Sequence, residues 1–214
     1  GGNTIKLNVL QDAGGNAIFT SNGSGTLSGV NSEFGGGLTL IQSQTASSVA
    51  DVTFSSGIDT TYKVYEFRWY NVASATADAN FEFQANTSYN QVMTTNAYRA
   101  YQAESNAAQA FGYVQSDDQE QGTAYQRLIE GGGMPTEADA SCCGILTLFS
   151  PGSTTYVKQF MTRAHQMKLS GGQYYSIDSF FTGYFNTTTA LDKIQFKFSS
   201  GNISAGTIKM FGMG

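Results

Sequence analysis

Residues 61–72, TYKVYEFRWYNV, decide the fold class. Along this stretch Tyr65, Phe67 and Trp69 fall on one side, while Glu66 and Arg68 fall on the other. Because successive residues of a β-strand point to opposite faces, the alternation predicts a strand with one apolar, buried face. The opposite face mixes charged and aromatic side chains, which indicates a central strand whose outer side is partly covered. We therefore expect Trp69 to lie in the core.

The same period of two recurs along the rest of the chain. Residues 81–85 (FEFQA) and 194–198 (IQFKF) alternate cleanly, whereas residues 145–149 (ILTLF) are nearly all apolar and predict a strand buried on both faces. Further candidate strands lie at residues 5–9, 17–20, 38–41, 49–54, 97–101, 124–129, 156–167, 174–185 and 207–211. Such spacing predicts an all-β, antiparallel, jelly-roll-like β-sandwich. Helix should be scarce, and residues 98–110 are the candidate for a short one.

Glycine carries most of the chain reversal, because the chain holds 25 glycines and only 2 prolines. The sequence DAGGN at residues 12–16 predicts a hairpin turn, and the two FSSG segments at 54–57 and 198–201 predict two more. GGG at residues 131–133 predicts a flexible break. Residues 1–37 are rich in Gly, Ser and Asn. We expect them to form an N-terminal arm or hairpin that packs on the sandwich or on a neighbour, with residues 38–214 as a single β-sandwich domain.

The surface is expected to be polar but weakly charged. Charged residues make up 13% of the chain, against about 25% in ordinary soluble domains, and the net charge is −5. This balance argues against nucleic-acid binding, which depends on clustered Lys and Arg. Weak charge also lets subunits approach one another closely. No apolar run reaches the roughly 20 residues of a membrane span, so we expect no membrane insertion, and the first residues show no signal-peptide pattern.

Few residues suggest catalysis or metal binding. The adjacent Cys142 and Cys143 favour two reduced thiols over a vicinal disulfide, and one histidine with two neighbouring cysteines cannot assemble a Cys/His zinc site. His165 lacks a G-x-S-x-G partner motif, so a satisfied strand or interface histidine is favoured over a pH-sensitive contact. We expect no enzyme activity and no cofactor.

Asp117, Asp118 and Glu120 form the densest acidic run. Three interpretations stay open for them. A solvated loop is favoured, a loop that binds a cation through carboxylate oxygens comes second, and a pair of glycosidase carboxylates comes third. No D-x-D-x-D-G calcium loop surrounds the run, which weakens the second interpretation.

Aromatic residues crowd the predicted strand at residues 174–185. Because they occupy both faces, one set suits the core, and the other must face a partner subunit, a sugar or a second sheet. The residues that we take as candidates for an interface or a ligand site are Tyr174, Tyr175, Phe181 and Tyr184.

The C-terminal segment resembles a known family. Residues 194–203 (IQFKFSSGNI) and 206–212 (GTIKMFG) are similar to the ending of a family of marine bacteriophage virion proteins. Three further segments fit the same family: LNVLQD at 7–12, the "FSSGID-x-TY" pattern at 54–62 and the "TTYVKxF" pattern at 154–160. The resemblance spans residues 5 to 212 and is poorest at 105–140.

The resemblance implies a structural protein of the virion exterior, as a tail-fibre component or a capsid decoration, assembled in the cytoplasm of a bacterial host. It implies no catalytic residues, and its partners are further copies of the chain, as a homotrimer, and other virion proteins. Two alternatives remain open. One is an adhesin that binds a host surface glycan through residues 86–91 or 116–121, and the other is an envelope depolymerase.

Overall fold

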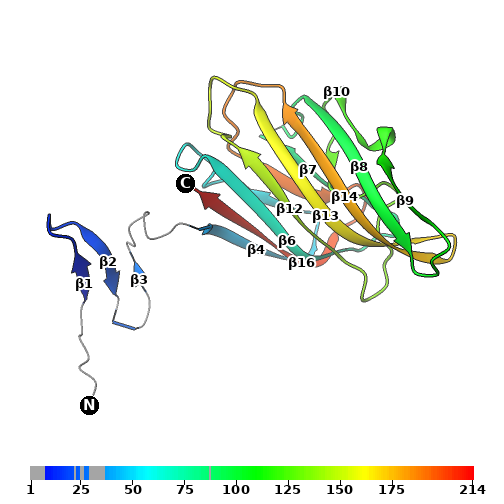
Figure 1. Ribbon diagram of the computed structural model, residues 1–214, viewed down its shortest axis with the longest axis horizontal. Helices are drawn as coiled ribbons and strands as arrows, with labels where there is room; N and C mark the ends of the chain where they lie inside the picture. The colour runs from blue at the N-terminus through cyan, green and yellow to red at the C-terminus, as the bar shows by residue number, and fades with distance from the viewer. Residues whose placement is uncertain (1–7, 22, 25–26, 29–36, 87) are drawn as a thin grey trace, which may run out of the picture. The chain divides into compact units, whose positions relative to one another are not determined.

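The computed structural model describes residues 8–21, 23–24, 27–28, 37–86 and 88–214 (Figure 1). The chain divides into two compact units, Gly1–Thr39 with Gly214, and Leu40–Met213. The division lies close to the expected one after residue 37. Residues 5–7 of the predicted first strand lie outside the described residues.

The N-terminal unit holds a small antiparallel sheet in the order β1-β2-β3. Its strands are β1 (Val9–Gln11), β2 (Ala17–Ser21) and β3 (Leu27–Ser28). Asp12 closes the turn between β1 and β2, because its Oδ1 accepts hydrogen bonds from the N–H groups of Gly14 (2.8 Å) and Asn16 (2.9 Å). Such side-chain turns are typical of Asp. The hairpin predicted at residues 12–16 is therefore confirmed.

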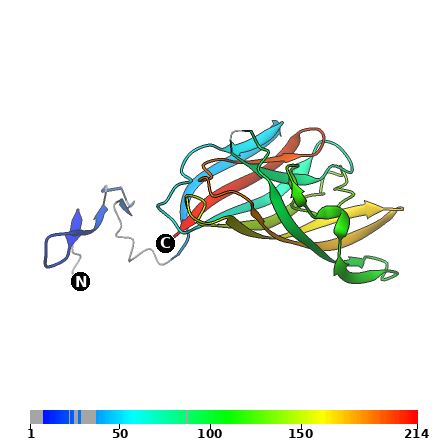
Figure 2. The ribbon, with the colours of Figure 1, turned by 90° about the horizontal axis from the view of Figure 1, so that it is seen from above.

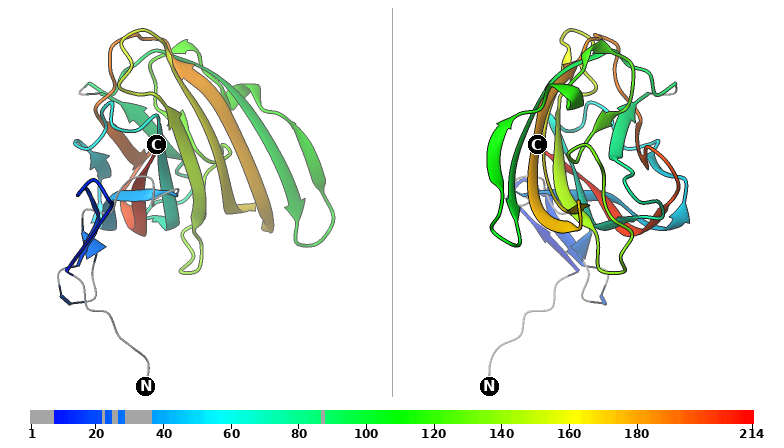
Figure 3. Two further views of the ribbon diagram at one scale, coloured as in Figure 1. Left: turned by 60° about the vertical axis from the view of Figure 1, so that its left-hand side comes forward. Right: turned by 90° about the vertical axis from the view of Figure 1, so that its right-hand side faces the viewer.

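The larger unit is a sandwich of two antiparallel sheets, the two layers seen in Figures 2 and 3. The large sheet has nine strands in the order β10-β8-β14-β13-β12-β6-β16-β4, with β9 also paired to β8. Its strands are β4 (Thr39–Val49), β6 (Val64–Ser74), β8 (Met93–Ala103), β9 (Gln109–Tyr113), β10 (Glu120–Gly122), β12 (Cys142–Phe149), β13 (Lys158–Ser170), β14 (Gln173–Phe185) and β16 (Ile203–Met213).

The small sheet has the order β11-β7-β15-β5. Its strands are β5 (Asp51–Phe54), β7 (Phe81–Ala85), β11 (Gln126–Arg127) and β15 (Ile194–Phe198). These strands have 2 to 5 residues, whereas β8, β13 and β14 of the large sheet have 11 to 13. The long strands therefore extend beyond the small sheet.

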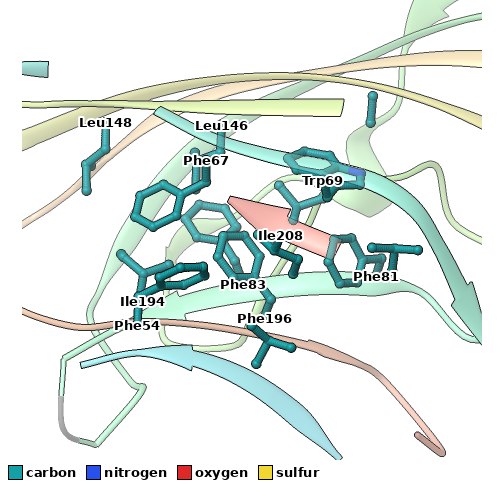
Figure 4. Close-up of a cluster of buried hydrophobic side chains, with 14 of the residues drawn as sticks. Phe54, Phe67, Trp69, Phe81, Phe83, Leu146, Leu148, Ile194, Phe196 and Ile208 are labelled. Carbon is teal, nitrogen blue, oxygen red and sulfur yellow. The ribbon is translucent and has the colours of Figure 1, made fainter. Parts of the chain in front are cut away.

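The core lies between the facing sides of the two sheets (Figure 4). Trp69 is 1% exposed and meets Phe81 of the small sheet edge to face, with ring centroids 5.7 Å apart. Phe67 contacts both Phe54 (5.3 Å) and Phe196 (5.5 Å). Edge-to-face aromatic pairs add to the free energy of burial. The prediction that Trp69 lies in the core is confirmed.

The all-β antiparallel sandwich is confirmed, while the jelly-roll connectivity stays a prediction. Among the described residues, the helical segment is one 3-10 turn at Gln115–Asp117. The helix suggested for residues 98–110 is wrong, because they belong to β8, a turn and β9. The prediction for residues 145–149 is also wrong. Ile145 is 37% exposed, so β12 has one buried face and one open face.

The two FSSG segments are not hairpin turns. Each follows a strand of the small sheet, β5 or β15, and leads to a strand of the large sheet, β6 or β16. The strands before the two turns pair with each other instead, with Phe54 opposite Ile194. The shared sequence therefore marks two crossings between the layers. Glycine is needed at both turns, since Gly57 has φ +80° and Gly201 has φ +69°.

The run Gly131–Gly133 is a tightly packed turn instead of the expected flexible break. A Cβ on Gly133 would lie 2.2 Å from the carbonyl carbon of Asp78, and one on Gly132 would lie 2.7 Å from Lys168 Nζ. Both glycines also have positive φ, +90° at Gly132 and +60° at Gly133. The glycines thus allow the chain to approach its neighbours closely.

Candidate functional site

The face of the large sheet that points away from the small sheet carries an unusual set of side chains. Alternate residues of β6, β12, β13, β14 and β16 point to this outer face, as the period of two requires. Met161 is 56% exposed there, Tyr70 is 40% exposed and Ile145 is 37% exposed. We define the outer face by its central residues, Arg68, Tyr70, Ile145, Met161, Arg163, Phe180, Tyr184, Lys209 and Phe211.

Strand register aligns much of this set into one row across the sheet. Lys209 pairs with Arg68, Arg68 with Ile145, Ile145 with Arg163, and Arg163 with Phe180. The row continues from Phe180 to Tyr98 on β8 and to Tyr113 on β9. Apolar, aromatic and cationic side chains therefore adjoin one another without a break from β16 to β9.

The cations of the outer face lie over aromatic rings. The guanidinium carbon of Arg68 is 5.5 Å from the ring centroid of Phe211, and that of Arg163 is 5.1 Å from Phe180. Each arginine also pairs with a carboxylate of its own face, Arg68 with Glu66 and Arg163 with Asp178. Such contacts favour positions of the guanidinium groups over the aromatic rings. The result is a broad surface of low net charge.

A shallow depression of about 470 Å³ on this face contains the only histidine of the chain. Nε2 of His165 and Oγ of Ser176 lie 2.8 Å apart and share a hydrogen bond. Asp178 pairs with His165 in the strand register, but its carboxylate accepts bonds from Nε and Nη2 of Arg163. A hydrolytic relay needs a carboxylate on the second histidine nitrogen and donors for an oxyanion. Within the described residues, His165 forms no hydrogen bond with a carboxylate.

The four aromatic candidates of β14 separate into three environments. Phe181 is 1% exposed on the inner side, so it is not available as a surface residue. Tyr184 and Tyr174 point to the outer side, where Tyr174 Oη donates to Glu137 Oε1 (3.4 Å). Tyr175 points to the inner side near the end of the strand, where it lines a cavity with Arg99 and Lys168. The structure thus separates residues that the sequence had grouped.

The acidic run at residues 117–120 also separates. Asp117 is buried, pairs with Arg127, and accepts a hydrogen bond from the N–H of Gly131 (2.8 Å). Asp118 accepts a hydrogen bond from the hydroxyl of Tyr113, and Glu120 is exposed on β10. Asp117 therefore fixes the chain locally and is not part of a solvated loop. In the described part of the chain, no three His, Cys, Asp or Glu side chains are grouped so that they could hold a metal ion.

Glu82 lies on the outer side of the small sheet, opposite Arg127 of β11 and Lys197 of β15. Burial raises the pKa of its carboxyl to about 7, although the positive charges of Lys197 and Arg127 act in the opposite direction. Desolvation disfavours the charged form of a carboxyl group. Glu82 is thus a half-buried carboxyl group with a raised pKa, which its sequence position did not suggest.

Both cysteines are free thiols. Cys142 is buried and Cys143 is exposed, as their adjacent places on β12 require. Burial raises the pKa of the Cys142 thiol well above its ordinary value. Membrane-crossing helices are not found in the part of the chain that the structure describes.

Sequence reasoning missed the main feature of the outer face, which is its cross-strand row. Arg68 and Arg163 lie far apart in the sequence, and only strand order and register place both beside Ile145. The available signal was in the ILTLF sequence at residues 145–149, where apolar residues occupy both faces of the strand. Comparison of the chain with protein-family models, with curated proteins and with solved structures finds no match in any of the three.

Proposed function

We propose that this chain is a non-enzymatic structural protein of a bacteriophage particle, displayed on the virion exterior and assembled with copies of itself through the outer face of its large sheet. The observation that carries the proposal is the exposure of the neighbouring apolar side chains Met161 (56%) and Ile145 (37%) on that face. The virion setting rests on the resemblance of the four sequence segments.

Exposed apolar surface of this kind favours association. Full burial of one Met or Ile side chain contributes about 1.5–3 kcal/mol. Contiguous apolar patches on a soluble domain mark interaction surfaces. Arg, Met and aromatic residues are also enriched at protein interfaces, and these types meet around Ile145. The composition of the outer face therefore suits contact with another protein better than contact with water.

The electrostatics of this face also suit association. The charges of Arg68 and Arg163 are each matched within the chain by a carboxylate. A second copy would meet little net charge there, in keeping with the 13% charged residues of the whole chain. Closed symmetry would bury such faces without open-ended growth. The trimer is the stoichiometry that the family resemblance implies.

The test is the mass of the purified chain in solution by light scattering at micromolar concentration. We expect a homo-oligomer for the parent, and a mass near the 22.9 kDa of one chain for the double variant Met161→Glu with Ile145→Glu. Tyr156→Glu is the matched control, because Tyr156 is 72% exposed and lies outside the outer face. Circular dichroism verifies the fold of each variant.

A parent chain that is monomeric at these concentrations would contradict assembly. An oligomer that survives the double variant would contradict the choice of face but not assembly itself. The virion setting needs its own experiment, in which antibodies against the chain label whole particles for electron microscopy. Particles without label, from a lysate that contains the chain, would contradict the location.

A further inference from the structure

The inner side of the large sheet contains a small cavity where its long strands extend past the small sheet. The volume is about 190 Å³, smaller than the roughly 300–1,000 Å³ of sites for drug-sized ligands. It suits a ligand of one ring. β8, β13 and β14, neighbours in the sheet (Figure 1), supply most of the wall. The residues that matter below are Arg99, Tyr101, Glu130, Lys168, Ser170 and Tyr175.

The remaining wall consists of Ala108, in the turn between β8 and β9, and a segment that follows β11 and supplies Glu130. This segment is fixed at several points. The N–H of Glu130 donates to Ser179 Oγ (3.1 Å), and the N–H of Gly131 donates to the buried Asp117 (2.8 Å). At its far end, the N–H of Asp78 donates a hydrogen bond to the carbonyl of Met134 (2.9 Å). Since both ends of the segment are bonded to the sandwich, the cavity is formed before any ligand binds, which lowers the entropic cost of binding.

Two cations and one carboxylate meet in this cavity. Glu130 pairs with Arg99 through Oε1 and with Lys168 through Oε2, the latter at 2.6 Å. Lys168 Nζ also donates to the carbonyl of Gly131 (2.6 Å). The charged groups of the lining therefore carry a net charge of +1, in a chain whose net charge is −5. One further negative charge would balance the site.

The lowered pKa of Lys168 agrees with the net positive charge of the lining. Burial lowers the pKa of its ammonium group, and the positive charges of Arg99 and Arg127 lower it further, whereas the carboxylates of Asp117 and Asp78 raise it. Burial and neighbouring positive charge both disfavour the charged form of an ammonium group. A carboxylate in the cavity would counter the second of them.

Several polar groups of the lining have no hydrogen-bond partner within the described residues. They are the hydroxyls of Tyr101, Tyr175 and Ser170, together with the Nε and Nη2 groups of Arg99. A guanidinium group holds five N–H donors in a fork that matches a carboxylate. Arg99 uses only Nη1 for Glu130, so its other nitrogens remain available for a second carboxylate.

The two tyrosine rings give the cavity its shape. Tyr101 and Tyr175 meet at 77° with centroids 5.9 Å apart, and the guanidinium of Arg99 lies 5.2 Å from the Tyr101 centroid. Tyrosine offers an apolar ring face and a polar tip. A sugar ring matches this combination, because its C–H groups pack on an aromatic face while its hydroxyls bond to phenols and serines.

We propose that this cavity binds one acidic sugar of the uronic-acid class, with its carboxylate on Arg99 and its ring against Tyr175. The inference goes beyond the proposed assembly function, since the cavity and the outer face lie on opposite sides of the large sheet. It also differs from the glycan-binding loops expected at residues 86–91 and 116–121.

Titration of the full-length chain with galacturonate, followed by NMR or calorimetry, tests the proposal. We expect saturable binding with a dissociation constant on the order of 1 mM, typical of one small polar ring. Arg99→Gln and Tyr175→Ala should each weaken binding at least about tenfold, equivalent to about 1.4 kcal/mol. Glu130 keeps Lys168 as its partner in the first variant. Lys63→Gln is the control, because it removes one positive charge from an exposed site elsewhere.

Glucose and acetate are the comparison ligands. Glucose should bind at least about tenfold more weakly than galacturonate, because it lacks the carboxylate, and acetate should bind more weakly because it lacks the ring. Equal binding of glucose would overturn the role of Arg99, and equal binding of acetate would overturn the sugar. No saturation by galacturonate, or full binding by folded Arg99→Gln and Tyr175→Ala, would overturn the site. None of these outcomes bears on the oligomeric state.

Discussion

Replacement of Trp69 by Ala is expected to be the most damaging single truncation in the core. Trp69 is 1% exposed and joins the two sheets through Phe81. It also fills space that Gly144 leaves open, since a Cβ on Gly144 would lie 2.3 Å from Cζ2 of the indole. Rigid strands on both sides limit how far the cavity left behind can collapse. Truncation of a buried Trp costs about 3–5 kcal/mol in such sites.

The assay is urea unfolding followed by circular dichroism, with a thermal melt beside it. For a chain of this size each kcal/mol lowers the melting temperature by about 2–4 °C, so Trp69→Ala should lower it by about 6–20 °C. Tyr156→Ala is the control, since Tyr156 is 72% exposed and lies outside the outer face. It should cost less than about 1 kcal/mol. A Trp69→Ala protein that melts within two degrees of the parent would refute the role of Trp69 in the core.

Three further substitutions test other parts of the molecule. In urea titrations, Glu82→Gln should stabilise the protein by about 1–2 kcal/mol at pH 8 and by little at pH 4. The value at pH 8 is reduced to allow for solvent screening of a partly exposed group. The sign follows because the folded pKa of about 7 exceeds the ordinary 4.5, so the parent loses stability as pH rises between these values. Gly133→Ala should lower the free energy of unfolding by about 2–4 kcal/mol, whereas Gly171→Ala, also at positive φ but with no atom within 4 Å, should cost less. Neither the parent nor Ser176→Ala should hydrolyse chromogenic esters, and activity that disappears in the variant would mean that the pair with His165 is catalytic.

The strands were predictable because each carries its own signal. In β6, β7 and β15 large apolar side chains alternate with polar ones, as at Tyr65, Phe67 and Trp69, and these apolar side chains are buried in the structure. The alternation depends only on local backbone geometry, so it is the same for any order of the strands in the sheet. The hairpin at Asp12 was predictable for the same reason, since its hydrogen bonds join residues within one turn.

Features that depend on distant pairings were not predictable. The FSSG segments look like hairpin turns because the local sequence cannot show that β5 pairs with β15, far along the chain. In β14 the alternation separates Phe181 from Tyr184, but it cannot distinguish Phe181 in the closed part of the sandwich from Tyr175 in the open part. Both lie on the same side of the strand. That distinction depends on where the small sheet ends.

The unequal size of the two sheets accounts for the cavity, and the lack of a covering layer in the described part of the chain accounts for the outer face. A small sheet of short strands can cover only part of a sheet whose strands reach 13 residues. Past its edge, the inner side of β8 and β14 would expose Tyr101 and Tyr175, and the segment around Glu130 covers this region incompletely, which leaves the cavity. The outer face has no covering layer within the described residues of this chain. Exposure of its apolar side chains therefore raises the free energy of the isolated molecule. A second copy that covers the outer face would remove this cost.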